Sequence, residues 1–250
     1  MKTAIVTGAA RGIGLATTQK LLSAGWHVAM VDCDADELSN ASKGLGNILT
    51  FATDVSDPDQ VTALHQDLSN HWPHLTGLVN NAGLARFGPI EDTDFDTWRA
   101  VMATNLDGPF LMTQRFTPML KATTGASVVN ITSISGLRAS TLRVAYGTSK
   151  AALAHLTQQY AVELGEYGIR VNGVAPGPVR TKLAMAVHTP EIISAYHDAL
   201  PLNRYGTETE LAAAICFLLS DEASYVTGQI LAVDGGFEAT GIGLPALRPD

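Results

Sequence analysis

The sequence predicts one α/β domain built on a doubly wound parallel sheet. Apolar, β-branched segments alternate with helical segments along the chain, the order that gives a parallel sheet covered on both faces. The strand-like segments are apolar in nearly continuous runs, as two-sided burial requires. The predicted strands are Ala4–Thr7, Val28–Asp32, Ile48–Asp54, Gly77–Asn80, Ser127–Thr132, Arg170–Ala175 and Gln229–Asp234. The predicted helices are Ile13–Ala24, Ala35–Ser42, Pro58–Asn70, Phe95–Leu120, Ser149–Glu166 and Glu208–Leu219.

A glycine-rich turn follows the first predicted strand. Gly8, Gly12 and Gly14 lie between that strand and the helical run that begins at Ile13. Glycines in this place let the chain turn tightly, let its backbone approach a pyrophosphate and let the helix pack close to the sheet. The free N–H groups and the dipole of the helix N-terminus attract the same anion. The turn therefore predicts a Rossmann-like dinucleotide-binding unit.

The second predicted strand ends on a carboxylate. Asp32 comes about twenty residues after the turn, where an acidic residue accepts hydrogen bonds from an adenosine ribose. The alternative is that Asp32 only caps the next helix. Asp32, Asp34 and Asp36 resemble the start of a calcium loop, but Glu37 and Lys43 occupy its glycine and glutamate positions. The histidines have no zinc-site spacing, so no metal is expected.

Tyr146 and Lys150 form the most informative pair in the chain. Residues four apart on a helix share a face, so the Lys150 ammonium is expected near the Tyr146 phenol. A nearby cation favours the phenolate, which predicts a lowered tyrosine pKa. A tyrosine tuned in this way exchanges protons with an alcohol or a carbonyl compound near neutral pH. The alternative is an ordinary amphipathic helix start.

Composition narrows the possible partners and surroundings. The net charge of -8 disfavours a nucleic-acid partner. No apolar run reaches membrane-spanning length, and no signal peptide precedes the first strand. Cys33 and Cys216 form no spaced framework, so they are expected to be free thiols and the protein cytoplasmic. Charged residues make up only 16% of the chain, which suggests that some surface is buried between subunits.

With these features in place, the chain resembles the short-chain dehydrogenase/reductase family nearly from end to end. The family's motifs occur in order and are specific as a set. They are Thr7-Gly8-x-x-x-Gly12-Ile13-Gly14, Asp54-Val55, Asn80-Asn81-Ala82-Gly83, Asn105, Ser133, Tyr146-x-x-x-Lys150 and Pro176-Gly177. Thr148 is a small departure, since alanine is common there, and it removes no catalytic group.

The resemblance implies roles for single residues. Tyr146 would be the general acid or base, Lys150 would lower its pKa and bind the nicotinamide ribose, and Ser133 would hold the substrate oxygen. Asn105 would connect Lys150 to a water chain. The positions implied for the cofactor are Gly8, Arg11, Gly12, Ile13, Gly14, Asp32, Asp54, Val55, Asn81, Ala82, Gly83, Tyr146, Lys150, Pro176, Gly177, Val179 and Thr181.

The choice between NAD and NADP rests on two opposing residues. Asp32 would repel the 2′-phosphate of NADP, whereas the family sometimes uses a basic residue near the turn, here Arg11, to hold that phosphate. Arg11 would also be attracted to Asp32. Because Cys33 adds no positive charge beside Asp32, NAD is the expected cofactor.

The expected function is interconversion of a secondary alcohol and a ketone by a single domain spanning residues 1–250. An irregular segment at about residues 177–206 is interpreted as a substrate lid, because it follows a strand's carboxyl end. Its mixture of polar and apolar residues, with that of residues 135–144, favours a small polyol, sugar or hydroxy-ketone. Two alternatives stay open: an NADPH-dependent 3-oxoacyl thioester reductase, and a non-catalytic dinucleotide-binding sensor or scaffold.

The end of the chain bears on assembly. The segment Val226–Phe237 is apolar, and Ile242–Leu247 follows it with no charged residue. An exposed apolar tail is a liability on a monomer, so we expect it to pack against a neighbouring subunit. Family members are commonly tetramers, and a homotetramer is the resulting expectation.

Overall fold

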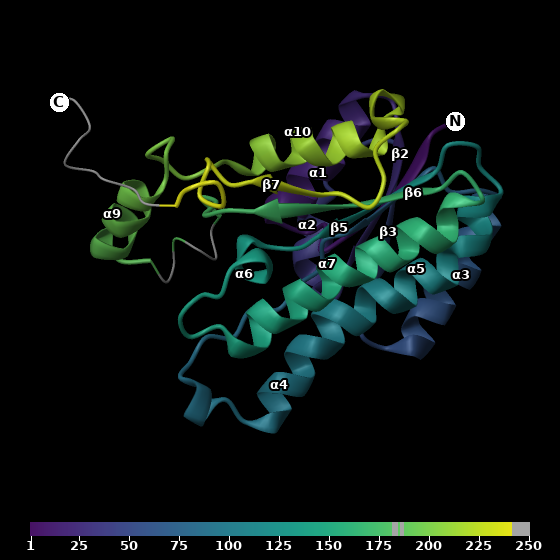
Figure 1. The fold of residues 1–250 in the computed structure, drawn as a ribbon. Coiled ribbons are helices and arrows are strands. Elements are labelled where there is room, and N and C mark those ends of the chain that lie inside the picture. Colours follow the sequence, from purple (N-terminus) through teal and green to yellow (C-terminus); the bar gives the residue numbers. More distant parts are fainter. Residues whose placement is uncertain (182–184, 186–187, 242–250) are drawn as a thin grey trace.

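The computed structural model describes residues 1–181, 185 and 188–241, and its centre is a seven-stranded parallel sheet. The strand order is β3-β2-β1-β4-β5-β6-β7 (Figure 1), which confirms the doubly wound sheet expected from the sequence. The strands are β1 (Thr3–Thr7), β2 (His27–Asp32), β3 (Ile48–Ala52), β4 (Gly77–Asn80), β5 (Ser127–Ile131), β6 (Arg170–Pro176) and β7 (Ile230–Val233).

Helices cover both faces of the sheet (Figure 1). The described helices are α1 (Gly12–Ser23), α2 (Ala35–Ala41), α3 (Pro58–His71), α4 (Phe95–Met102), α5 (Gly108–Lys121), α6 (Ile134–Leu137), α7 (Val144–Gly165), α9 (Pro190–Ala199) and α10 (Glu208–Leu219). One apolar core lies between the sheet and α3, α5 and α7, with Phe116 fully buried in it. A second core lies under α1, α2 and α10 on the other face. The inner strands are buried on both sides for this reason.

The side of β1 on which the chain adds new strands changes between β3 and β4. The first three strands build outward from β1 to β3, and the chain then returns to pair β4 with the other side of β1. Such a switch point leaves a crevice at the carboxyl ends of the strands, where open α/β sheets bind ligands. The Thr7 hydroxyl closes the base of this crevice, since it accepts hydrogen bonds from the backbone N–H groups of Asn81 and Ala82, both at 2.9 Å.

One predicted helix is divided in the structure. The segment Phe95–Leu120 forms α4, a π-helical turn at Ala103–Asp107 and then α5. The Asn105 side chain, buried in that turn, exchanges hydrogen bonds with the backbone of Leu84. A contact with a segment outside the helix therefore sets the position of the turn. The hydrophobic periodicity of the sequence gives no sign of that contact.

Two further differences lie next to each other after β5. The helix predicted from Ser149 begins at Val144 instead, so Tyr146 lies in its first turn. A short helix, α6, precedes it and was not predicted. Gly136 of α6 lets the two helices approach closely, because a Cβ there would lie 2.6 Å from the carbonyl carbon of Lys150.

The segment predicted as a lid follows β6 and contains α9, which lies beyond the carboxyl end of the sheet (Figure 1). Within this segment the sequence also predicts a short helix near Glu191–Ala199, and α9 agrees with it. Residues 182–184 and 186–187 of the segment and the apolar tail Ile242–Leu247 lie outside the described residues. None of the helices in the described ranges has the length and hydropathy of a membrane span.

Candidate active site

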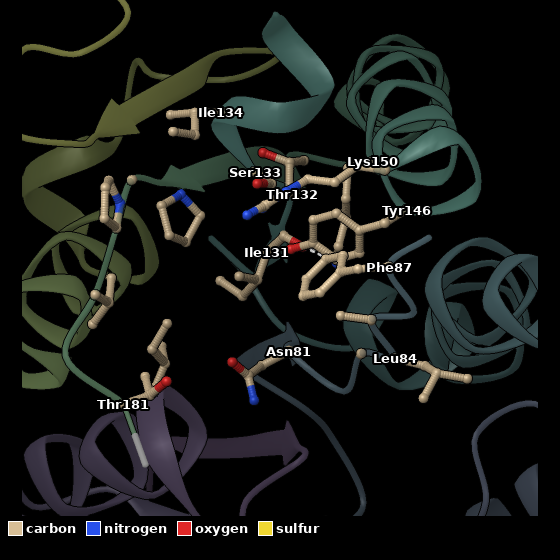
Figure 2. Close-up of a pocket in the computed structure, with 18 of the residues that line it drawn as sticks. Asn81, Leu84, Phe87, Ile131, Thr132, Ser133, Ile134, Tyr146, Lys150 and Thr181 are labelled. Carbon is tan, nitrogen blue, oxygen red and sulfur yellow. Dashed lines mark hydrogen bonds between the residues drawn. The ribbon is translucent and has the colours of Figure 1, made fainter. Parts of the chain in front are cut away.

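A cavity of about 270 Å³ opens at the carboxyl ends of β4, β5 and β6. Figure 2 shows Tyr146 pointing its hydroxyl into this cavity, with Ser133 on the same side and Asn81 and Thr181 across from them. The lining residues are Ile13, Asn81, Gly83, Leu84, Ala85, Phe87, Ile131, Thr132, Ser133, Ile134, Arg143, Tyr146, Lys150, Pro176, Gly177, Pro178, Val179, Thr181, His188 and Tyr196.

The glycine turn has the conformation that its sequence predicts. Gly8 and Gly12 have φ angles of +62° and +58°, in the left-handed region that favours glycine. A Cβ at Gly14 would collide with the carbonyl oxygen of Gly8, so only glycine lets α1 approach the turn. The first turn of α1 has no side-chain cap and no acidic residue, which leaves its N–H groups available to an anion.

Asp32 is positioned by the backbone around it. One of its carboxylate oxygens accepts a hydrogen bond from Ala10 N at 3.0 Å, and the other accepts one from Asp34 N at 3.1 Å. These contacts connect the end of β2 to the glycine turn. Asp34, not Asp32, caps α2, because its side chain accepts a hydrogen bond from Glu37 N.

Arg11 pairs with a different carboxylate from the one expected. Its guanidinium forms an ion pair with Asp34, whereas the sequence suggested an attraction to Asp32. Both side chains are partly exposed, at 58% for Arg11 and 42% for Asp34. The hydrogen bond from the Glu37 backbone amide, and after it the Arg11 guanidinium, hold the pKa of Asp34 below its ordinary value. Sequence reasoning missed this role of Asp34, although its position two residues after Asp32 could have suggested it.

The predicted cofactor residues divide into two groups. Nine of them line the cavity: Ile13, Asn81, Gly83, Tyr146, Lys150, Pro176, Gly177, Val179 and Thr181. The others lie outside its lining: Gly8, Arg11, Gly12, Gly14, Asp32, Asp54, Val55 and Ala82. Asp54 accepts hydrogen bonds from the backbone and hydroxyl of Ser56, and the buried Val55 packs against Gly108.

Lys150 lines the cavity but is almost entirely buried. Its side-chain nitrogen donates a hydrogen bond to the carbonyl oxygen of Ile131 at 2.7 Å, and only 4% of the residue is exposed. The same nitrogen lies 5.9 Å from the centre of the Tyr146 ring. Burial lowers the pKa of Lys150 from 10.5 to about 8, because the charged form loses its hydration.

Tyr146 is partly buried beside Phe87, whose ring packs edge-on against it at 6.2 Å between centroids. Its pKa is raised above the ordinary tyrosine value because burial disfavours the phenolate. A hydrogen bond with Ser133 and the Arg143 guanidinium oppose part of that rise. The expectation that Lys150 lowers this pKa is not met in the structure, since the Lys150 ammonium donates to Ile131 instead of to the phenol.

Asn105 connects three segments of the site. Its amide oxygen accepts a hydrogen bond from Leu84 N at 2.7 Å, and its amide nitrogen donates to Leu84 O at 2.9 Å and to Ser149 Oγ at 3.0 Å. Ser149 in turn donates to the carbonyl oxygen of Tyr146 at 2.7 Å. Asn105 thus holds the chain after β4 against the first turn of α7, and Ser149 is a supporting residue that sequence reasoning missed.

Several substrate-side residues meet at the far end of the cavity. Arg143, His188 and Tyr196, which the sequence placed in the substrate-facing loops, line it, as does Phe87, which was missed. No local motif marks Phe87, because its position depends on how the loop after β4 folds. Arg138, by contrast, is paired with Glu238 outside the lining. Within residues 1–181, 185 and 188–241, no cluster of side chains has the composition of a metal site.

Comparisons with known proteins agree with this geometry. A family model described as enoyl-(acyl carrier protein) reductase matches residues 8–238. Galactitol 2-dehydrogenase (L-tagatose-forming) of Cereibacter sphaeroides is 38% identical, covering 94% of both chains. A 3-oxoacyl-(acyl-carrier-protein) reductase of Thermotoga maritima is 37% identical, covering 94% of this chain and 97% of its own. A solved short-chain type dehydrogenase/reductase from Mycobacterium ulcerans superposes with a TM-score of 0.91 at 34% identity, covering 95% of this chain and 90% of that one.

Burial of Lys150 should make the free energy of unfolding depend on pH. Between pH 8 and 10.5 the unfolded chain binds more protons than the folded chain, so the stability of the wild type rises with pH in that window. Lys150→Met removes this dependence and also the hydrogen bond to Ile131. We expect the variant to be more stable by about 2 kcal/mol at pH 7, with the gap narrowing toward pH 10. Chemical denaturation at several pH values measures it, and a gap that is constant from pH 7 to 10 would contradict it.

Proposed function

Because this chain belongs to the short-chain dehydrogenase/reductase family, we propose that it uses NAD(H) to interconvert a secondary alcohol and a ketone on a small polyol, sugar or hydroxy-ketone. Its class is that of an oxidoreductase acting on CH–OH groups with a nicotinamide dinucleotide. The observation that carries the assignment is the meeting of Ser133, Tyr146 and Lys150 in one cavity beside the glycine turn.

The residues present fit such a dinucleotide. A side chain at Gly14 would collide with the Gly8 carbonyl oxygen, and the uncapped start of α1 would offer its N–H groups to the phosphates. Asp32 would accept hydrogen bonds from the adenosine ribose, and Asn81, Gly83 and Lys150 would border the nicotinamide half. When bound, the nicotinamide supplies the hydride acceptor or donor.

Side chains of the protein would carry out the proton transfer. Ser133 would hold the substrate oxygen, and Tyr146 would take the hydroxyl proton during oxidation or return it to the carbonyl oxygen during reduction. Burial raises the pKa of Tyr146 and so favours the neutral phenol, whereas positive charge at the site favours the phenolate. Lys150 would supply part of that charge, since its ammonium lies close to the ring. Asn105 would keep the Tyr146 backbone in place through Ser149.

Two acidic residues support NAD over NADP. The Asp32 carboxylate would repel a 2′-phosphate, and the Arg11 guanidinium that could offset this is already paired with Asp34. An NADPH-dependent 3-oxoacyl thioester reductase is therefore a second candidate with weaker support, although a 3-oxoacyl-(acyl-carrier-protein) reductase is 37% identical. Galactitol 2-dehydrogenase is as similar, and the small, partly polar cavity suits a compact hydroxylated substrate better than a carrier-bound chain. Residues 177–206 would close over that substrate as the lid.

Two separate apolar surfaces support the proposed homotetramer. Phe110 on α5 and Val162 on α7 are 42% and 80% exposed on one side of the molecule. Phe217 on α10 and Leu231 on β7, which is an edge strand of the sheet, are both 40% exposed. Two distinct self-complementary interfaces give a closed tetramer, whereas one gives a dimer.

Replacement of Tyr146 by Phe tests the proton-transfer role. The variant keeps the ring packing against Phe87 and loses only the hydroxyl, so kcat should fall by roughly 10²–10⁴-fold while the affinity for NADH stays nearly unchanged. Steady-state kinetics with an alcohol substrate and fluorescence titration with NADH measure the two quantities. Near-normal turnover in the variant would refute the role of Tyr146.

Cofactor choice is tested at the end of β2. The wild type should prefer NAD over NADP by about 10- to 1000-fold in kcat/KM, or about 1–4 kcal/mol. Asp32→Ala should shift that ratio toward NADP, because the repulsion of the 2′-phosphate is removed. Asp34→Ala, which frees Arg11, should improve NADP use with little change for NAD. The proposal is wrong if the wild type prefers NADP or if the ratio does not move in Asp32→Ala.

The assembly is tested on the α7 surface. Light scattering of the wild type at micromolar concentration should give the mass of a tetramer. Val162→Glu should give a dimer of unchanged fold, since a charge placed in an apolar interface is costly and the residue is exposed in the monomer. Circular dichroism provides the control for folding. A wild-type monomer at that concentration would exclude the proposed assembly.

A further inference from the structure

We propose that Arg143 binds a carboxylate carried by the substrate, an assignment that rests on the oxidoreductase function proposed above and narrows its substrates to hydroxy acids, including sugar acids, and the matching oxo acids. Arg143 stands at the N-terminus of α7, three residues before Tyr146, and lines the same cavity. A substrate whose hydroxyl reaches Tyr146 and Ser133 would therefore have its other end near this guanidinium.

The charge distribution of the cavity points to an anionic ligand. The whole chain carries 24 acidic and 16 basic residues, yet the described lining includes Arg143 and Lys150 and neither aspartate nor glutamate. Lys150 is assigned to the proton chemistry and its ammonium donates to Ile131. Arg143 is thus a cation in a carboxylate-free cavity of an acidic protein, which attracts anions selectively.

Arg143 is held in place by uncharged groups. Its guanidinium donates to the hydroxyl of Ser135 at 3.4 Å and to that of Tyr196 at 3.2 Å, and it lies over the ring of Phe87 at 4.6 Å. Three other arginines, Arg11, Arg138 and Arg204, each have a carboxylate partner. Within the described residues Arg143 has no such ion pair. Its contacts orient the guanidinium and leave its charge uncompensated.

The field of Arg143 reaches the groups around the cavity. It opposes the rise in the pKa of Tyr146, and together with burial it lowers the pKa of His188. Its contacts with Ser135, Tyr196 and Phe87 lie away from the glycine turn and from Asp32, where the dinucleotide phosphates and the adenosine would bind. The ligand that this charge faces is therefore the substrate. A planar guanidinium binds a planar carboxylate through two parallel hydrogen bonds, which favours a carboxylate over a neutral hydroxyl group.

The test compares matched substrates that differ only in charge. The probes are 2-hydroxypropanoate, 3-hydroxybutanoate and 4-hydroxypentanoate, each beside its carboxamide, with NAD as the cofactor. We expect the wild type to favour at least one carboxylate over its carboxamide by tenfold or more in kcat/KM. In Arg143→Gln the kcat/KM for that carboxylate should fall by about 30- to 300-fold, mainly through KM, and the carboxamide should change by less than about threefold.

Two further variants separate charge from packing. Arg143→Lys keeps the charge without the planar fork and should recover part of the carboxylate preference. Arg138→Gln removes an arginine of the neighbouring loop that is paired with Glu238 outside the cavity, and the preference should persist. If the carboxamides are used as well as the carboxylates by the wild type, or if both classes fall equally in Arg143→Gln, the carboxylate site is refuted while the oxidoreductase function stands.

A binding measurement keeps the two proposals distinguishable. Butanoate and butanamide are titrated by calorimetry into the protein saturated with NAD, a readout that needs no turnover. Butanoate should bind the wild type and bind Arg143→Gln about 30-fold or more weakly, with butanamide weak in both. If no alcohol is oxidised with either cofactor but this difference holds, the proposed function fails and the carboxylate site is supported. Equal binding of butanoate to both proteins overturns the site.

Discussion

The buried ammonium of Lys150 is the constraint on which the arrangement of the site depends. A cation that is only 4% exposed loses most of its hydration, and the hydrogen bond to the Ile131 carbonyl compensates for part of that loss. The contact fixes the start of α7 to the end of β5. Gly83 lies beside the ammonium, where a Cβ would make an ordinary van der Waals contact with the Lys150 nitrogen at 3.6 Å. The site is therefore maintained at a cost in stability, as functional sites commonly are.

Asn105 extends this constraint to the other side of the cavity. Its primary amide both accepts and donates, so one side chain satisfies the N–H and C=O groups of Leu84 while also contacting Ser149. The π-helical turn is what brings that amide inward between α4 and α5. Hydrogen bonds consequently connect the loop after β4, the π-helical turn and the first turn of α7. They set the position of Tyr146, which lies in that first turn of α7. The position of Tyr146 therefore depends on hydrogen bonds that involve the backbone of Leu84 and of Tyr146 itself.

The end of β2 and the cavity differ in the charge of their side chains. At the end of β2 the carboxylates of Asp32 and Asp34 lie close together, and the Arg11 guanidinium is paired with Asp34. At the substrate end, the described lining contains no carboxylate and Arg143 keeps its charge. The two guanidiniums differ only in their neighbours. The acidic balance of the whole chain thus says little about the charge that a ligand meets within the cavity.

The sequence by itself determined the sheet, its helices and the positions of the glycine turn, because two-sided burial and close backbone approach restrict residue type locally. Asp32, Ser133, Tyr146 and Lys150 were predicted as site residues for the same reason, each standing at the end of a strand or near the start of a helix. Only the tertiary structure decided the π-helical break at Asn105, the direction of the Tyr146 pKa shift and the partners of Arg11 and Arg143. These depend on burial and on contacts between segments far apart in the chain, such as Arg143 and Tyr196, and no local pattern records which neighbour a charged side chain will meet.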